Sequence, residues 1–297
     1  MQGRFVNGPF DQKSDKGDGK MRKIASRNNP ETLFAASLLT KKGRESSGYF
    51  TAEGDKLFRE AAKAENASRI DRVYLSEGDE DRYLPIVAES LGSAFVESDR
   101  TVVFSEAAFS KITSEKSPQG IITVLKSIDF SKKYIKINKK DSDKFAGRRI
   151  LALAGVRDPG NLGAVVRSAV AFGFTDVVLS SDCVEVTNPK TIRAAMGGIF
   201  SLSFHVVSDF ASFVLSMRDA GRRFFAAELR DGAKPISDVG LTPDDVIVIG
   251  NEGHGVPTDI SALADASVYI PISPAAESLN AAVAASLFLW EQSKAGN

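Results

Sequence analysis

Short apolar runs alternate with longer amphipathic segments throughout the second half of the chain. The runs, each four or five residues long, predict buried strands at 151–154, 177–180, 224–228, 246–250 and 268–272. Apolar positions three and four apart predict helices at 162–171, 190–196, 210–220 and 279–292, with a short turn near 257–263. Strands that are apolar at nearly every position are covered on both faces. The pattern therefore predicts an α/β domain with a doubly wound parallel sheet over 150–297.

The first half of the chain carries shorter elements of both kinds. Helices are predicted at 29–39, 55–64, 84–91 and 106–112, and strands at 49–54, 73–76, 94–96 and 120–125. At the first helix, Asn29 can act as the N-cap and Pro30 suits the first turn. This alternation predicts a smaller α/β domain over 21–127. Residues 1–20 are rich in Gly, Asp and Lys without a sustained period, which predicts a disordered leader.

A basic segment separates the two predicted domains. Residues 126–149 contain nine Lys and Arg against three Asp. We assign 128–149 to a linker on this composition. A solvated linker is the favoured interpretation, and a tether that also contacts phosphates stays open.

Composition narrows the classes of function. Among 297 residues with a formal net charge of zero there are one cysteine, Cys183, and two histidines. A single cysteine excludes an intramolecular disulfide framework and a multi-cysteine zinc site, so we expect no metal. No apolar run approaches the ~20 residues of a membrane span, and the N-terminus lacks the apolar core of a signal peptide. We therefore expect a cytoplasmic protein that does not associate with membranes.

Charge is spread unevenly along this neutral chain. Residues 20–44 contain seven Lys and Arg against one Glu. Such a cluster is either an anion-binding face or an ordinary solvated surface.

Polar loops follow three of the predicted strands. The first, GVRDPGN at 155–161, leads into a helix that carries Arg167 among apolar residues. Asn161 is either a helix N-cap or a functional amide, and the permanently charged Arg167 suits a phosphate or a carboxylate. The second loop, GNEGHG at 250–255, lacks the Lys-Ser/Thr of a phosphate loop, and no strand is followed by the Rossmann glycine fingerprint.

The third loop, at 270–280, ends in a polar Ser-Leu-Asn before a strongly apolar helix. Taken alone, Ser278 could simply cap that helix. Because ligands of open α/β sheets bind at the carboxyl ends of the strands, the three loops together predict one site.

Together and in this order, the three loops resemble the SpoU (TrmH-like) family of RNA ribose 2′-O-methyltransferases, in the SPOUT superfamily. The motifs are DPGNLGAVVRSAVAFG at 158–173, VIVIGNEGHGV at 246–256 and YIPISPAAESLNAAVAAS at 269–286. NPKTIRAAMGG at 188–198 resembles the family's intermediate segment, and the N-terminal half resembles its substrate-binding domain. Pro274 stands where the family often has glycine, which affects how the third loop meets the cofactor.

The resemblance implies a fold, a reaction and partners. The C-terminal SPOUT methyltransferase domain is expected to form a deep trefoil knot and to bind S-adenosyl-L-methionine. The reaction is expected to be methyl transfer to a ribose 2′-hydroxyl by a homodimer whose active site uses both subunits, without a metal. Ribosomal RNA is favoured over transfer RNA as the substrate. The alternatives are a catalytically inactive RNA-binding module of the same fold and, less favoured, a Rossmann-type small-molecule enzyme.

The resemblance also assigns residues by their position in the motifs. The catalytic candidates are Arg167, Asn161, Glu252, Ser278 and Asn280. The candidates for cofactor binding are Leu229, Gly250, Asn251, Glu252, Gly253, Ile270, Ile272, Ser278, Leu279 and Asn280. The candidates for RNA binding are Lys41, Lys42, Arg44, Arg157 and Arg193. Because a guanidinium stays protonated at ordinary pH, we expect Arg167 to bind the target phosphate and stabilise developing alkoxide, and the route of the proton stays open.

Overall fold

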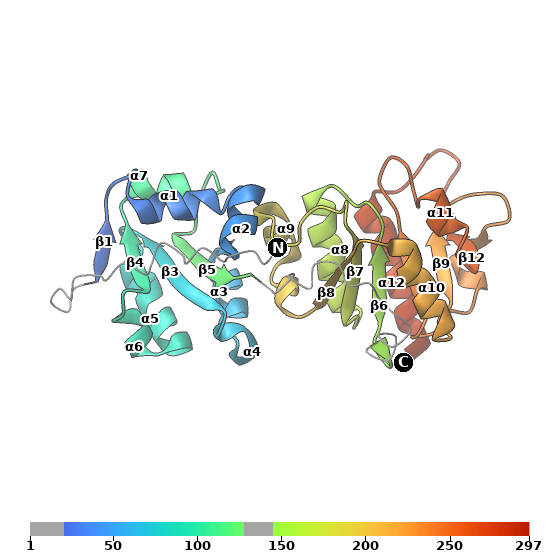
Figure 1. The fold of residues 1–297 in the computed structure, drawn as a ribbon, viewed down its shortest axis with the longest axis horizontal. Helices are drawn as coiled ribbons and strands as arrows, with labels where there is room; N and C mark the ends of the chain where they lie inside the picture. The colour runs from blue at the N-terminus through green and yellow to red at the C-terminus, as the bar shows by residue number, and fades with distance from the viewer. Residues whose placement is uncertain (1–20, 128–144, 297) are drawn as a thin grey trace, which may run out of the picture. The chain divides into compact units, whose positions relative to one another are not determined.

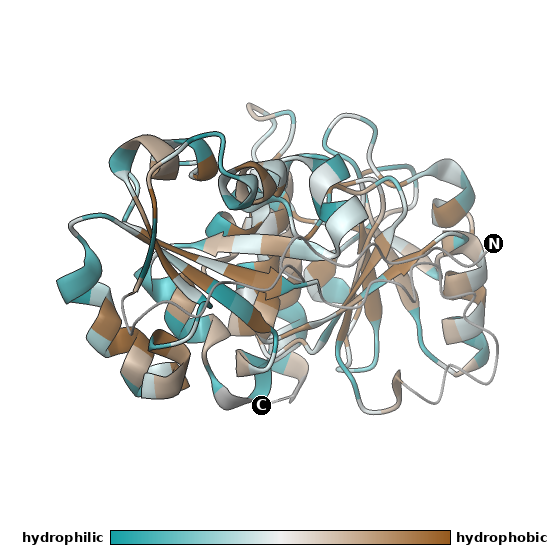
Figure 2. Cartoon of the chain, turned by 60° about the vertical axis from the view of Figure 1, so that its left-hand side comes forward, coloured by the Kyte–Doolittle hydropathy of each residue, from teal (hydrophilic) through white to brown (hydrophobic). Residues whose placement is uncertain are grey.

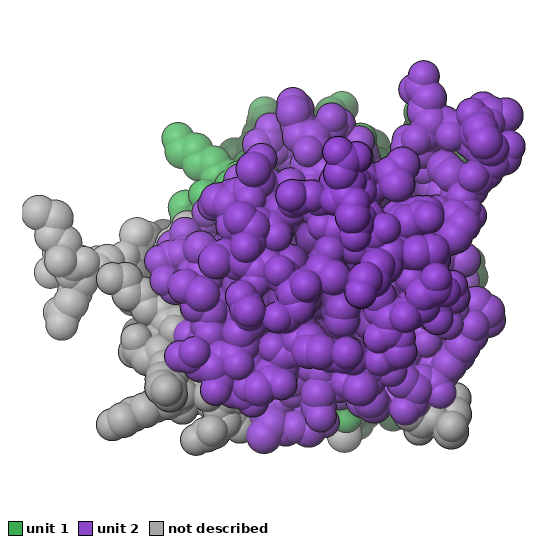
Figure 3. Space-filling view, turned by 90° about the vertical axis from the view of Figure 1, so that its right-hand side faces the viewer, with its two compact units in different colours: residues 1–128, 187–193 green, residues 129–186, 194–297 purple. Residues whose placement is uncertain are grey.

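The structure, a computed structural model, describes residues 21–127 and 145–296. The chain divides into two compact units, coloured in Figure 3: unit 1 comprises residues 1–128 and 187–193, and unit 2 comprises residues 129–186 and 194–297. The predicted leader at 1–20 and most of the predicted linker lie outside the described residues. Within the described ranges, no helix combines the length and apolarity needed to span a membrane.

Unit 2 contains a seven-stranded sheet in the order β10-β12-β9-β11-β6-β7-β8. Every pair of neighbouring strands is parallel, so the predicted parallel α/β sheet is confirmed. The strands are β6 (Ile150–Leu153), β7 (Asp176–Ser180), β8 (Ser203–Val207), β9 (Phe224–Ala227), β10 (Lys234–Pro235), β11 (Val246–Ile249) and β12 (Ala266–Tyr269). The edge strands β8 and β10 were not predicted from the apolar runs.

The helices of unit 2 bury the apolar faces of this sheet, whose strands are brown along much of their length in Figure 2. Alternate residues of β6, Ile150 and Ala152, share a core with Phe213 and Met217 of α10, and Leu151 and Leu153 point to the opposite face. The helices are α8 (Pro159–Ala171), α10 (Phe210–Asp219), α11 (Thr258–Ser261) and α12 (Ala281–Ser293), with a short 3₁₀ turn at Gly198–Phe200. α8 and α12 pack against each other, and α12 also packs against β11.

The strand order reverses at the centre of the sheet (Figure 1). From β6 the chain adds β7 and β8 on one side, and then returns to place β11 directly against β6, with Ile249 opposite Leu153. In open α/β sheets such a reversal opens a crevice at the carboxyl ends of the strands. The loops after β6 and β11 therefore leave the sheet side by side. The trefoil knot stays a prediction for this unit.

Unit 1 contains a five-stranded mixed sheet in the order β1-β4-β3-β5-β2, in which β5 is antiparallel to both its neighbours. Its strands are β1 (Arg22–Ile24), β2 (Tyr49–Glu53), β3 (Ile70–Ser76), β4 (Thr101–Phe104) and β5 (Ile121–Lys126). Its helices are α1 (Pro30–Ser37), α2 (Lys41–Ser47), α3 (Asp55–Ala61), α4 (Ala64–Ala67), α5 (Glu80–Leu91), α6 (Ser93–Val96), α7 (Glu106–Ile112) and α9 (Pro189–Ala195), the last reaching unit 1 from later in the sequence.

Unit 1 differs from the sequence prediction at one strand and contains a helix that was not predicted. The strand predicted at 94–96 is helix α6, which buries Phe95, and the strand is instead β4, whose four residues are all buried. A run of only three apolar residues fits either structure, so its periodicity could not distinguish them. The basic stretch that begins at Lys41 forms a helix, which Thr40 caps through the backbone N–H of Gly43.

Candidate active site

The chain after β6 places a carboxamide that does not cap the helix, that of Asn161, at the start of α8. Asp158, and not Asn161, caps this helix, because its side chain accepts a hydrogen bond from the Asn161 N–H at 2.7 Å and Pro159 occupies the first turn. The interpretation of Asn161 as a cap is therefore wrong. Its side-chain amide is free to make contacts outside the helix.

A chain of hydrogen bonds joins the three motif loops through Asn161. The Asn161 Nδ2 donates to Oε1 of Glu252 at 3.0 Å, and its Oδ1 accepts from Nδ2 of Asn280 at 3.0 Å. Asn280 also caps α12, since its Oδ1 accepts from the N–H of Ala282 at 2.9 Å and of Val283 at 3.3 Å. The structure thus brings together three of the five predicted catalytic residues, which lie up to 119 positions apart.

Arg167 and Ser278, the other two catalytic candidates, are exposed. Arg167 projects from α8 and makes no hydrogen bond or ion pair with any described residue. Ser278 lies in the exposed stretch 271–278, which includes Pro274, and its hydroxyl likewise contacts no polar partner in the described ranges. Both side chains thus keep their full hydrogen-bonding capacity with respect to the described residues.

The loop after β11 folds back on itself around Asn251. The backbone groups of Asn251 and Gly255 exchange two hydrogen bonds of 2.9 Å. A Cβ on Gly250 would lie 2.1 Å from the carbonyl carbon of Gly255, so only glycine fits there. The Asn251 Oδ1 accepts from the N–H groups of Gly253 and His254, at 2.9 and 3.2 Å. This compact loop exposes Glu252 and Gly253 at its tip.

Exposed apolar side chains mark the carboxyl ends of β9 and β12. Leu229 is 78% exposed just beyond β9, and Ile272 is 38% exposed beyond β12. These strands are neighbours, with Ala227 paired to Val268. Ile270 and Leu279, also predicted to contact the cofactor, are half-buried in the segment after β12. An apolar surface next to polar loops suits a ligand that has an aromatic ring and charged ends.

The carboxylate of Glu228 holds the segment that carries this apolar edge. Glu228 Oε1 accepts hydrogen bonds from the hydroxyls of Ser261 and Ser267, the latter at 2.6 Å, and lies 3.4 Å from Nη1 of Arg230. Burial would raise the pKa of Glu228, but these hydrogen bonds outweigh it and lower the pKa below its ordinary value. Glu228 therefore stays ionised and fixes the segment that carries Leu229.

The predicted RNA-binding residues have contrasting environments. Lys41 and Lys42 are exposed in the first turn of α2. Arg44 is 5% exposed and donates from Nη1 to the Leu38 carbonyl oxygen at 3.0 Å, so it stabilises the turn between α1 and α2 and cannot reach a phosphate. Arg157 in unit 2 pairs with Asp182 at 3.4 Å, and Arg193 in α9 pairs with Glu115 of the same unit. We leave Arg44 out of the RNA contacts.

The sequence interpretation missed a polar pair beyond β7. The Gly155 N–H donates to the Ser180 Oγ at 2.8 Å, and the Ser180 hydroxyl donates to Oδ1 of Asp182 at 2.5 Å. The signal for these contacts in the sequence is Ser180-Ser181-Asp182 at a strand end, next to the single cysteine. Burial raises the pKa of the Cys183 thiol, so it stays protonated and unreactive.

Family descriptions match both halves of the chain. Residues 148–290 match the SpoU rRNA Methylase family, and residues 29–123 match the MRM3-like substrate binding domain. Over 270 residues the chain is 30% identical to the 23S rRNA (guanosine(2553)-2′-O)-methyltransferase RlmP of Bacillus subtilis (strain 168), a match that spans 91% of this chain and 98% of that protein. This chain belongs to the SpoU rRNA methylase family.

Solved structures are similar to this SpoU-family chain over nearly its whole length. An AdoMet-bound rRNA methyltransferase from Sinorhizobium meliloti matches with a TM-score of 0.73 and 25% identity, over 92% of this chain and 98% of that one. An RNA 2′-O ribose methyltransferase matches with a TM-score of 0.73 and 26% identity, also over 92% and 98%. These likenesses confirm the fold class expected of a SpoU methyltransferase with an added N-terminal domain.

Proposed function

We propose that this protein transfers a methyl group from S-adenosyl-L-methionine to the 2′-hydroxyl of a ribose in ribosomal RNA. The observation that carries the proposal is the hydrogen-bonded chain Asn280–Asn161–Glu252 at the reversal point of the sheet. Its middle residue, Asn161, lies on the same helix as Arg167, which has no polar partner among the described residues. Membership of the SpoU family supports the reaction, and the name of the Bacillus subtilis relative supports ribosomal RNA as the substrate.

The residues at the carboxyl ends of β9, β11 and β12 fit this cofactor. Leu229 and Ile272 offer an exposed apolar surface for the adenine ring. At Gly250 the backbone approaches Gly255 so closely that no side chain could come between them, which leaves backbone groups of this loop to meet the ligand. Gly253, Ile270, Leu279 and Ser278 complete the proposed pocket. When bound, the cofactor supplies an electrophilic methyl group.

Arg167 and the amide chain position the ribose hydroxyl, whose proton leaves to the bound phosphate, to water or to another group. The Arg167 guanidinium binds a phosphate of the target nucleotide and stabilises negative charge as it develops on the ribose oxygen. Asn161, held between Glu252 and Asn280, orients the ribose. Methyl transfer needs the ribose oxygen in line with the methyl group, so orientation supplies much of the rate. Within the described residues, no three His, Cys, Asp or Glu side chains gather to hold a metal.

The RNA contacts are proposed on Lys41 and Lys42 of unit 1 and on Arg157 of unit 2, all of which are exposed. Lysines at the surface contact phosphates without reading sequence. The ion pair between Arg157 and Asp182 is 69% and 53% exposed at its two side chains, so a phosphate can compete for this guanidinium. We place the enzyme in the cytoplasm, where its RNA substrate would be.

We also propose a homodimer that forms through α12. Val283, Leu287 and Trp290, spaced four and three residues apart, are 49%, 38% and 47% exposed on one side of this helix. The opposite side, including Phe288 and Leu289, is buried in unit 2. A helix that is apolar on both sides needs a second partner to cover it. Light scattering coupled to gel filtration tests this proposal, and a monomer at micromolar concentration contradicts it.

The decisive experiment measures cofactor binding and methyl transfer with the purified chain. Calorimetry should show binding of S-adenosyl-L-methionine, and tritiated methyl groups should enter an unmodified 23S rRNA transcript. Transcripts of 16S rRNA and of transfer RNAs serve as comparison substrates. Absence of cofactor binding at millimolar concentration overturns the enzyme and favours an inactive RNA-binding module. Transfer only to transfer RNA overturns the proposed substrate.

A further inference from the structure

Both backbone groups of Gly155 are held by side chains, one from Ser180 at the end of β7 and one from Asn251 in the loop after β11. β6 follows the ladder until the Ala154 N–H, which donates to the Ile249 carbonyl oxygen at 2.8 Å. At Gly155 the chain turns away with φ of +75°, its N–H donating to Ser180 and its carbonyl oxygen accepting from Nδ2 of Asn251, both at 2.8 Å. The positive φ favours glycine at this position, and a Cβ would also lie 3.2 Å from Oδ2 of Asp182.

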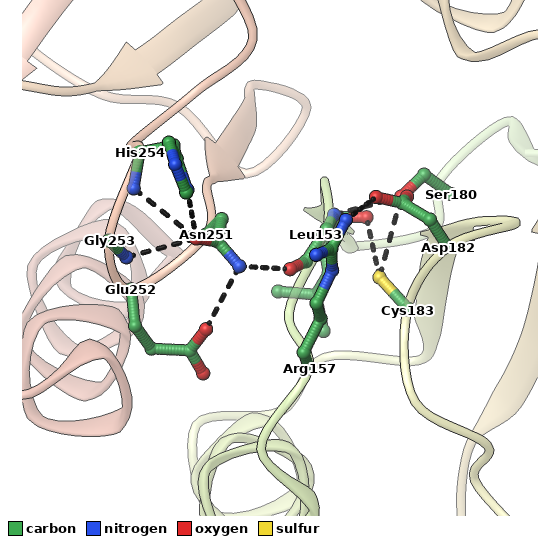
Figure 4. A network of polar contacts seen from close by, with 10 residues as sticks. Leu153, Arg157, Ser180, Asp182, Cys183, Asn251, Glu252, Gly253 and His254 are labelled. Atoms are coloured by element: carbon green, nitrogen blue, oxygen red, sulfur yellow. Dashed lines mark hydrogen bonds and ion pairs between the residues drawn. The ribbon is translucent and has the colours of Figure 1, made fainter.

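The turn after β7 holds the neighbouring segment at further points. The Ser180 hydroxyl donates to Oδ1 of Asp182, and the other oxygen of Asp182 pairs with Arg157. The Val184 N–H donates to the Val156 carbonyl oxygen at 2.9 Å. Ser180 thus joins the carboxylate of Asp182, which lies beside it in Figure 4, to the Gly155 backbone. Because one hydroxyl supplies both bonds, removing it releases the loop and the carboxylate together.

Asn251 extends the same chain of contacts to the proposed catalytic residues. Figure 4 shows its amide between Gly253 and His254 on one side and Glu252 on the other. Its Nδ2 lies 3.3 Å from Oε2 of Glu252 and also donates to Gly155. The polar atoms of this side chain are therefore engaged within the protein. The resemblance predicted that Asn251 contacts the cofactor. Its side chain is better suited to holding the two loops together.

We propose that Ser180, Asp182 and Asn251 are positioning residues that clamp the backbone of Gly155 and thereby fix Glu252 and Asn161. The continuous path runs from Asp182 through Ser180, Gly155, Asn251 and Glu252 to Asn161. None of the three residues needs to touch substrate. Loss of the clamp lets the loops after β6 and β11 move independently, and a displacement of about 1 Å at an active site can lower the rate about a hundredfold.

The first test does not depend on enzymatic activity. Hydrogen–deuterium exchange in peptides that cover 154–161 should become about tenfold faster in Ser180→Ala, because the Gly155 N–H loses its acceptor. The neighbouring exposed Ser181 provides the matched control, and Ser181→Ala should exchange like the wild type. Ser180→Thr keeps a hydroxyl and should restore slow exchange. Unchanged exchange in Ser180→Ala overturns the clamp, whatever the protein catalyses.

The second test is kinetic and rests on the proposed function. With an unmodified 23S rRNA transcript, Ser180→Ala and Asp182→Asn should lower kcat about tenfold, with the RNA KM and the cofactor Kd changed less than about threefold. Asn251→Asp keeps the acceptor oxygen but turns an oxygen toward Glu252 and Gly155, so kcat should fall about a hundredfold. A double variant of Ser180 and Asp182 should lose little more than either single variant.

The outcomes separate the two proposals. A wild-type protein without methyl transfer overturns the proposed function, and the exchange experiment still decides the clamp. A kcat equal to that of Ser181→Ala in all three variants overturns the positioning role. Selective loss of cofactor binding in Asn251→Asp, with kcat at saturating cofactor unchanged, shows instead that Asn251 contacts the cofactor.

Discussion

Polar side chains gather at both ends of the parallel sheet of unit 2, under opposite conditions. At the amino end, Asp176 is 1% exposed and lies within hydrogen-bond distance of Arg148 at 2.5 Å and His205 at 2.7 Å. Asp245, 2% exposed, is paired in the same way with Arg223 at 2.6 Å. At the carboxyl end, Asn161 is half-buried, and Glu252 and Asn280 are exposed.

The difference lies in what each cluster can still bind. Asp176 also accepts from the Thr175 hydroxyl at 2.7 Å, so its partners come from inside the protein on every side. Buried charges that are fully paired hold strands in place, and breaking such a pair is costly. The segments that follow the carboxyl ends, α8 and the loop after β12, instead keep Arg167 and Ser278 without polar partners among the described residues. We conclude that the functional end is distinguished by polar side chains that still have hydrogen-bonding groups available for a ligand, and not by a higher density of charge.

The largest expected effect breaks the functional end alone. Arg167→Ala should lower kcat about a thousandfold, or ~4 kcal/mol, because a preorganised charge at the developing alkoxide is lost. The cofactor Kd should change less than about threefold, and the free energy of unfolding by less than about 0.5 kcal/mol, since the side chain is exposed. Val170→Ala, on the same helix, is the control. Equal loss of cofactor binding and transfer contradicts the role given to Arg167.

The second largest expected effect is a loss of stability when the cluster at the amino end of the sheet is disrupted. Asp176→Asn should lower the free energy of unfolding by about 2 kcal/mol, because Arg148 and His205 lose a buried charged partner. The rate per folded molecule should stay within about twofold of the wild type. Urea unfolding measures the first quantity, with Asp231→Asn at an exposed position as the control. A selective fall in kcat at full stability contradicts the division between the two ends.

The two ends also differ in how far the sequence predicts them. The motif loops could be placed at one edge of the sheet because the carboxyl ends of parallel strands lie together. The residues of each loop are also contiguous in the sequence, so each loop could be recognised as a unit. The sequence analysis left Asn161 open as a helix cap or a functional amide, although Asp158 followed by Pro159 is the better signature of a helix start, with proline in the first turn. That dipeptide favours the functional amide.

Contacts between residues on different strands could not be predicted from the sequence. Asp176 meets His205 only because β7 pairs with β8 in a register that sets Asp176 against Ser203, and β8 itself was not predicted. The bond between Asn251 and Gly155 joins residues 96 positions apart and depends on β11 lying against β6. Apolar runs predict that strands exist, but their order and register are set by packing.

A third prediction separates two roles within one residue at the functional end. Asn280→Asp keeps the oxygen that caps α12 but loses the Nδ2 that donates to Asn161. Stability should therefore stay within about 0.5 kcal/mol of the wild type, and kcat should fall about tenfold. Asn280→Ala loses both contacts, so it should also lose about 1 kcal/mol of stability. If Asn280→Asp is fully active, its link to Asn161 has no catalytic importance.

The smallest effect distinguishes the two ends by pH. Burial raises the pKa of Asp176, but its hydrogen bonds outweigh burial, so the pKa lies below the ordinary value. The hydrogen bond from Ser180 lowers the pKa of Asp182 in the same direction. A carboxyl group with a lowered pKa in the folded state stabilises it above the unfolded pKa, and this contribution disappears as pH falls through the folded pKa.

The stability difference between wild type and Asp176→Asn should accordingly be constant from about pH 5 to 8 and shrink below about pH 4. Asp182→Asn should change stability by less than about 0.5 kcal/mol at every pH, because its partner Arg157 is exposed and solvent screens the pair. Urea titrations at several pH values test both statements. If the stability difference between wild type and Asp176→Asn instead grows as the pH falls, the pKa of Asp176 is raised in the folded state. The cluster at the amino end could then exchange a proton and would not be purely structural.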